Sequence, residues 1–193
     1  MKRCLFFLTL LLMMAAIVTG CGGNEASVKE EPKASEENAA VENKSAAEIP
    51  KLEVQQEMTV SLATIDGWEK SDEIRTALVY YKKEGNTVMV TRDRMPPEAE
   101  SPEKFLEFVK ERFFESFNNV VFHDVSEIGI SDSNKHFLVY THQIMNFEMK
   151  GWITYIFHDK YAYTLTCGGL SKDFPVLEED FRTFIESFKL IGK

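Results

Sequence analysis

Three consecutive apolar strands in the C-terminal half constrain the fold most strongly. The alternation of side chains predicts these strands at residues 136–144, 150–158 and 161–167. In the first of them, Leu138 and Tyr140 fall on one face, and Phe137 and Val139 fall on the other. A strand that is apolar on both faces is usually covered on both faces. The sequence therefore predicts an antiparallel meander buried between two layers.

Two amphipathic helices are the expected covering layers. The first should begin at Ser101-Pro102-Glu103, an N-cap followed by proline, and end near Phe117. Its apolar face carries Phe105, Leu106, Val109, Phe113 and Phe117. The second should begin near residues 171–173, and its apolar stripe is Leu177, Phe181, Phe184 and Phe188. The predicted fold class is therefore α+β, with an antiparallel sheet sandwiched between helices in an α/β/α order.

Further strands are expected before the meander. They are placed at residues 58–63, 75–82, 87–92 and 120–128. Glu84-Gly85-Asn86 separates the second from the third and indicates a hairpin. Met95-Pro96-Pro97 should end that hairpin, because proline cannot donate to a strand ladder. Gly168-Gly169 is expected to end the sheet.

The first 20 residues have the pattern of a secretory leader. Lys2 and Arg3 precede an apolar run that is too short to cross a bilayer comfortably, and Val18-Thr19-Gly20-Cys21 follows. This arrangement resembles the lipobox of bacterial lipoproteins. The resemblance implies cleavage before Cys21, acylation of its thiol and a lipid-anchored position on the extracytoplasmic face of a bacterial cell membrane. An ordinary signal peptide with a chance cysteine is the alternative.

The sequence behind the leader divides into a tether and a domain. Residues 21–50 contain no aromatic residue and are rich in Ala, Glu, Ser, Asn and Lys, so they cannot bury enough apolar surface to fold. A globular domain is expected over 51–193. Cleavage removes Lys2 and Arg3 and takes the net charge from −9 to about −11. So acidic a chain is not expected to bind nucleic acid or anionic lipid headgroups.

Cysteine usage indicates how the domain is stabilised. Cys4 lies in the leader, Cys21 is the expected lipidation site, and Cys167 alone remains. The mature domain therefore has no partner for an intramolecular disulfide, even in an oxidising compartment. A core of apolar side chains must stabilise it instead, and a domain of this length can build one.

Five short motifs occur in order along residues 58–190. They are Gly67-Trp68, Ser101-Pro102-Glu103, Gly151-Trp152, the strand 161–166, and Ser187-Phe188-Lys189. Their order and spacing resemble those of PsbP-like proteins, which include the bacterial DcrB-like lipoproteins, although the proline expected ahead of Gly67-Trp68 is absent. The resemblance implies a helix–sheet–helix fold and an accessory, partner-binding role. It implies no shared catalytic residues.

No pattern in the sequence predicts catalysis, a metal or a cofactor. The histidines, none at a metal-ligand spacing, are His123, His136, His142 and His158. Asp132-Ser133-Asn134 lacks the later glycine and glutamate of a calcium loop and is expected to be a turn. Cys167 shares a strand face with Tyr163 and Leu165, so burial is expected rather than reactivity. A G-x-S-x-G elbow and a phosphate-binding loop are both missing.

The predicted function is a non-enzymatic accessory or partner-binding module of the cell envelope. We expect it to contact an envelope protein through an exposed loop that combines charged side chains, a flexible thioether and rigid prolines. The alternative is that this loop is an ordinary polar connection between two elements. The residues are Arg92, Arg94, Met95, Pro96 and Pro97. An apolar pocket between sheet and helix would instead indicate a carrier of a small apolar ligand. A cleft with titratable groups of shifted pKa would indicate an envelope hydrolase.

Overall fold

The computed structural model describes residues 58–192, so the leader, Cys21 and the tether lie outside the described residues. The elements in chain order are β1 (Met58–Ser61), β2 (Glu69–Lys70), β3 (Val79–Lys83), β4 (Asn86–Arg94), η1 (Pro97–Ala99), α2 (Pro102–Ser116), β5 (Asn118–His123), η2 (Val125–Ile128), β6 (His136–Ile144), β7 (Phe147–His158), β8 (Tyr161–Leu170), η3 (Ser171–Asp173), α3 (Phe174–Ser187) and β9 (Lys189–Gly192).

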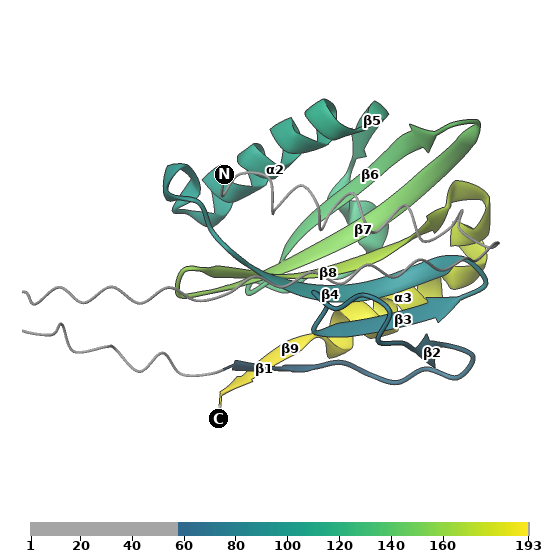
Figure 1. Ribbon diagram of the computed structural model, residues 1–193, viewed down its shortest axis with the longest axis horizontal. Coiled ribbons are helices and arrows are strands. Elements are labelled where there is room, and N and C mark those ends of the chain that lie inside the picture. The colour runs from purple at the N-terminus through teal and green to yellow at the C-terminus, as the bar shows by residue number, and fades with distance from the viewer. Residues whose placement is uncertain (1–57, 193) are drawn as a thin grey trace, which may run out of the picture.

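A seven-stranded antiparallel sheet forms the middle layer (Figure 1). Its strand order is β2-β3-β4-β8-β7-β6-β5, so the N-terminal hairpin joins the C-terminal meander through the β4–β8 pair. A separate two-stranded sheet pairs β1 with β9, which brings the two ends of the described chain together. Figure 1 shows α2 above the seven-stranded sheet and α3 below it. The predicted α+β arrangement of an antiparallel sheet between helices is confirmed.

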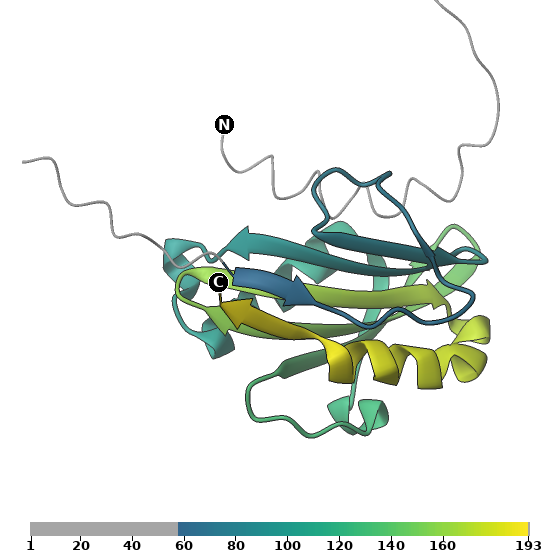
Figure 2. The same ribbon diagram turned by 90° about the horizontal axis from the view of Figure 1, so that it is seen from below.

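The face of the sheet below carries the larger core. The buried stripe of α3 packs there against Trp68 and Trp152, and the Trp68 ring lies edge-on to Phe184 with centroids 5.3 Å apart. Figure 2, seen from this side, shows α3 and the β1–β9 ribbon lying over the same face. Trp152 and Phe181 are fully buried. Each such side chain stabilises the fold by about 1.5–3 kcal/mol, so this core dominates its stability.

The opposite face is covered by α2. Ser101 caps the helix as expected, because its Oγ accepts a hydrogen bond from the Lys104 backbone N–H at 3.3 Å. Phe105 packs edge-on against Tyr155, and Phe113 packs edge-on against Tyr140 at 4.6 Å between ring centroids. The meander is therefore apolar on both faces, as predicted, and α3 packs on one face while α2 packs on the other.

Several predicted boundaries are wrong. The expected strand 75–82 begins only at Val79, and the expected strand 120–128 divides into β5 and the short helix η2. The first expected strand ends at Ser61 and pairs with β9 outside the main sheet. Gly168 and Gly169 do not end the sheet, because β8 continues through them to Leu170. The Asn86 side chain occupies the space beside Gly169 that a Cβ atom would need.

Candidate functional site

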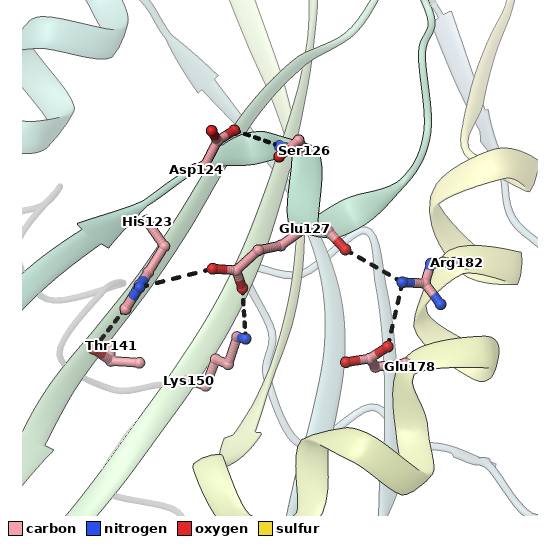
Figure 3. A network of polar contacts seen from close by, with 8 residues as sticks. All are labelled: His123, Asp124, Ser126, Glu127, Thr141, Lys150, Glu178 and Arg182. Atoms are coloured by element: carbon pink, nitrogen blue, oxygen red, sulfur yellow. Dashed lines mark hydrogen bonds and ion pairs between the residues drawn. The ribbon is translucent and has the colours of Figure 1, made fainter.

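A group of connected polar side chains centres on Glu127 (Figure 3). One oxygen of the Glu127 carboxylate lies 2.7 Å from Lys150 Nζ, and the other lies 3.8 Å from His123 Nδ1. The His123 Nε2 atom is 3.0 Å from the Thr141 hydroxyl. We call this group, together with Arg182, the Glu127 cluster. It joins η2 to the neighbouring strands β5, β6 and β7.

Arg182 attaches the same loop to α3. Its Nε donates to the backbone oxygen of Ile128 at 2.8 Å, and one Nη donates to the backbone oxygen of Glu127 at 3.2 Å. Gly129 follows with φ +71°, and a Cβ atom there would come within 3.6 Å of the Arg182 Nε. Asp124 caps η2 by accepting from the Ser126 N–H at 2.8 Å. The Asp124 cap and the positive φ of Gly129 therefore hold the η2 loop in the conformation whose backbone oxygens accept hydrogen bonds from Arg182.

The contacts of the Glu127 cluster indicate a structural role. Lys150 is paired with Glu127 and lies 5.4 Å from the Phe174 ring, while the Arg182 guanidinium lies 5.5 Å from the Trp152 ring. Partly exposed ion pairs contribute only about 0–1 kcal/mol each, so the cluster's main effect is to fix η2 in place. Its polar groups already satisfy one another. We therefore do not assign chemistry to this cluster.

An open depression lies at one end of the sheet. It has a volume of about 600 Å³ and is bounded by the turn between β6 and β7, the end of β8 and η3. Its lining residues are Asn146, Phe147, Glu148, Leu170, Ser171 and Lys172. The lining mixes two apolar side chains with one acidic and one basic group. This composition suits contact with a mixed protein surface better than enclosure of a small apolar molecule.

The segment predicted to bind a partner is not a loop over its whole length. Arg92 and Arg94 belong to β4, where pairing with β8 holds them in extended conformation, and both are exposed. Met95 is half-buried against the core under α2, and its N–H donates to the Lys160 oxygen at 2.9 Å. Pro96 is also half-buried, whereas Pro97 is exposed at the start of η1. Arg92 and Arg94 are exposed as predicted, but they do not lie in a loop, because the β4–β8 ladder extends further than the sequence suggested. The predicted exposure is wrong for Met95 and Pro96.

The exposed end of β4 nevertheless presents an ordered cationic and aromatic surface. The Arg92 guanidinium stacks at 5.1 Å over the Tyr161 ring of β8. Asp93 points to the other face of the sheet, where burial raises its pKa and a hydrogen bond from Thr91 partly offsets that effect. Arg92 and Arg94 are thus not neutralised by the carboxylate between them in sequence.

The titratable groups with the largest pKa shifts lie inside the cores. Burial raises the pKa of the Cys167 thiol well above its usual value, and this cysteine is fully buried, as expected from its strand face. Burial also raises the pKa of Tyr140 and Tyr155 beneath α2. Desolvation lowers the pKa of His142 to about 4, where its ring packs 4.7 Å from the Phe117 ring. None of these four side chains is open to a substrate.

The described residues 58–192 contain no group of three His, Cys, Asp or Glu side chains placed to hold a metal ion. Asp132, the first residue of the rejected calcium loop, forms the expected turn by accepting from the Asn134 N–H at 2.9 Å. That backbone hydrogen bond lowers the pKa of Asp132. Neither α2 nor α3 has the length and apolar character that crossing a bilayer requires.

Two structurally important residues were missed in the sequence. Lys135 is buried, and its ammonium group donates to the Ile185 oxygen at 2.8 Å, so it caps the C-terminus of α3 from 50 residues away. Nothing in the local sequence connects these segments. Met145, in the turn between β6 and β7, is 78% exposed with φ +54°. The turn Met145-Asn146 lacks the Asn-Gly or Asp-Gly signal of a two-residue hairpin, so the sequence did not mark it.

No family model matches the chain, and no curated protein matches its sequence. Solved structures do match. One is LpqN of Mycobacterium tuberculosis, which is described as involved in cell envelope biogenesis. Its sequence is 10% identical to this chain, the TM-score is 0.51, and the match covers 70% of this chain and 85% of LpqN. Another is the cyanobacterial PsbP of Synechocystis, at 11% identity and a TM-score of 0.45, over 75% of this chain and 98% of that one.

Identities this low concern the fold alone. The seven-stranded antiparallel sheet with two helices is the helix–sheet–helix arrangement that the resemblance in the sequence implied, and LpqN shares this fold.

Proposed function

We propose that this chain is a lipid-anchored accessory module of the bacterial cell envelope that binds a protein partner and catalyses no reaction. The observation that carries the proposal is the apolar leader ending in Val18-Thr19-Gly20-Cys21. A fold shared with LpqN, a protein described as involved in cell envelope biogenesis, supports the same setting.

The anchor determines how such a module works. Each buried methylene contributes about 0.8 kcal/mol, so one acyl chain binds reversibly, whereas two or three chains on Cys21 bind almost permanently. A tether of about 30 residues reaches roughly 30 Å from the bilayer if it behaves as a coil. Confinement to this layer raises the effective concentration of the domain near membrane partners, so even weak contacts become occupied.

The placement of the titratable groups supports a binding role. A hydrolase needs groups of shifted pKa at a surface that the substrate can reach. Cys167 and His142 have strongly shifted pKa values, but each is at most 1% exposed and lies beneath a helix. The shifts follow from burial in the cores. Aromatic side chains that could have lined a ligand cavity are likewise engaged with one another in those cores.

We propose the end of β4 as the surface that contacts the partner. Arginine and tyrosine are the residue types most often found at energetic centres of interfaces. Arg92 and Tyr161 are already stacked on an ordered strand pair, with Arg94 exposed beside them, so little side-chain entropy is lost on binding. The partner that fits this surface is an acidic protein surface of the envelope.

The anchor is tested with a pair of cysteine variants. We expect Cys21→Ala to abolish incorporation of radiolabelled palmitate and to release the protein from washed membranes, because the acceptor thiol is gone. Cys4→Ala is the matched control, since Cys4 is removed with the leader and should leave label and membrane retention unchanged. Undiminished label in the Cys21→Ala protein would refute the assignment.

The partner surface is tested by crosslinking in intact cells. The lipidated chain should yield one reproducible crosslinked neighbour, and Arg94→Glu should reduce its yield on the order of ten-fold because the charge is reversed at the contact. Lys104→Glu, an equal change of charge on the exposed face of α2, is the control. Failure to recover any specific neighbour, or equal loss in both variants, would contradict the proposed surface.

A further inference from the structure

The turn between β6 and β7 breaks two local rules at once. Ile144 and Phe147 are paired, so Met145 and Asn146 form a two-residue turn at the tip of a long hairpin. Met145 has φ +54°, in the left-handed region that favours Gly, Asn and Asp. Of the four non-glycine residues with positive φ in the described chain, it is the only apolar one. A strained backbone that holds an exposed apolar side chain points to a function for that side chain.

Exposed apolar side chains occur at this tip and at the start of α3. Met145 is 78% exposed and Phe147 is 59% exposed. Val176, in the first turn of the helix that follows η3, is 82% exposed. Two of these three are the most exposed large apolar side chains among residues 58–192, although scattered single ones are normal on a surface. Met145 and Phe147 lie together at the tip, and this pair marks a contact surface.

The tip stands directly beside the depression of about 600 Å³ described above, because Asn146, Phe147 and Glu148 line that depression. The surface therefore combines a protruding methionine with a hollow that offers Phe147 and Leu170. Its rim carries one carboxylate, Glu148, and one ammonium group, Lys172. A two-fold rotation can bring the protrusion of one copy to the hollow of another and the acid of one to the base of the other, as in an isologous interface.

We propose that this end of the domain is a self-association surface, at which two copies of the chain pair about a two-fold axis. The Met145 side chain of each copy enters the depression of the other, and Glu148 of each copy pairs with Lys172 of the other. Figure 1 shows the β6–β7 turn at the opposite end of the molecule from the start of β1. The surface is thus turned away from the side where the chain enters the domain, and two tethered copies can meet there.

The pairing is weak in solution and depends on the anchor. The net negative charge of the chain opposes association at long range. Physiological salt screens that repulsion beyond about 8 Å, whereas the close ion pairs and the apolar contact persist. Confinement of the lipidated chain to a membrane supplies the concentration that the contact needs. The inference rests on the proposed anchor in this respect.

The test counts copies on a membrane. Mature lipidated chain with a fluorescent tag at its C-terminus is placed in supported bilayers, and photobleaching steps per spot are counted as surface density rises. Glu148→Lys alone and Lys172→Glu alone should each lower the two-step fraction roughly five-fold, because each creates two like-charge contacts per pair. The double variant should restore it, since the two charges are exchanged together. Lys104→Glu, on α2, should leave it unchanged.

Met145→Asn separates the proposed contact from a merely structural role. Asparagine accepts positive φ better than methionine, so this variant should melt no lower than the wild-type chain. It should nevertheless lower the two-step fraction on the order of ten-fold, because the apolar side chain that enters the partner copy is lost.

Single-step spots at every density, or a double charge variant that stays monomeric, would overturn the inference. So would a Met145→Asn chain that pairs as the wild type does. Failure of the anchor looks different, because the tagged chain would then be absent from the bilayer.

Discussion

Gly151 is predicted to be a position where a single methyl group disrupts the core beneath α2. Tyr140 lies opposite it in the β6–β7 pair, with its ring against Phe113 at 4.6 Å between centroids. A Cβ atom at Gly151 would lie 2.4 Å from two carbon atoms of the Tyr140 ring. The ring cannot move away, because Tyr140 is 5% exposed and covered by α2. We expect Gly151→Ala to destabilise the fold by about 2 kcal/mol, as overpacking does in closely packed cores.

Gly168 provides the matched control, since it pairs with Gly151 across β7 and β8. A Cβ atom there would lie 3.7 Å from the nearest atom, the Lys150 backbone oxygen, which is ordinary contact. Gly168→Ala should therefore stabilise the protein by about 0.5 kcal/mol through the entropy of the unfolded chain. Urea unfolding followed by the fluorescence of Trp68 and Trp152 measures both. Equal stability of Gly151→Ala and wild type, or equal losses in the two variants, would refute the steric reasoning.

Three further predictions concern polar groups that the folded chain uses. His142 has a pKa of about 4 in the folded chain and about 6.5 in the unfolded chain. The neutral ring therefore adds up to about 3 kcal/mol to the free energy of unfolding above pH 6.5, and this stability is lost as the pH falls through 4. Urea unfolding at a series of pH values should show a smaller loss of stability at low pH in His142→Phe. Lys135→Met should cost about 2 kcal/mol in urea unfolding, because the Ile185 oxygen loses a charged donor. Arg182→Met should speed amide exchange around Ile128 more than it lowers global stability.

The helices and the strands of the meander could be predicted because the spacing of apolar residues along the sequence shows which side chains are buried. The stripe Leu177, Phe181, Phe184 and Phe188 places α3 correctly, and the two-sided apolar strands required a helix on each face. Ser101 marks the start of α2 to the residue, because capping is a local interaction. These features depend on neighbours within a few positions of one another.

The features that the sequence did not reveal depend on distant partners. Gly168 and Gly169 suggested a strand end, yet β8 runs through both, and Asn86 of β4 fills the space beside Gly169 that a side chain would take. The sequence predicted a loop at Arg92 and Arg94 because their partner strand β8 cannot be identified locally. That strand begins at Tyr161, 67 residues after Arg94. The β1–β9 pair joins segments more than 120 residues apart, and no local pattern indicates such a pairing.

Burial and exposure together limit where this domain can make contacts. Trp152 and Phe181 are fully covered on the α3 side, and the Glu127 cluster closes the remaining surface between η2 and α3 with mutually satisfied groups. The two contact surfaces proposed above lie at the two ends of the sheet. One end presents Arg92 stacked on Tyr161, and the other presents Met145 beside a hollow. Because these surfaces lie at opposite ends of the sheet, the two proposals are compatible: the proposed partner and a second copy would not compete for one surface.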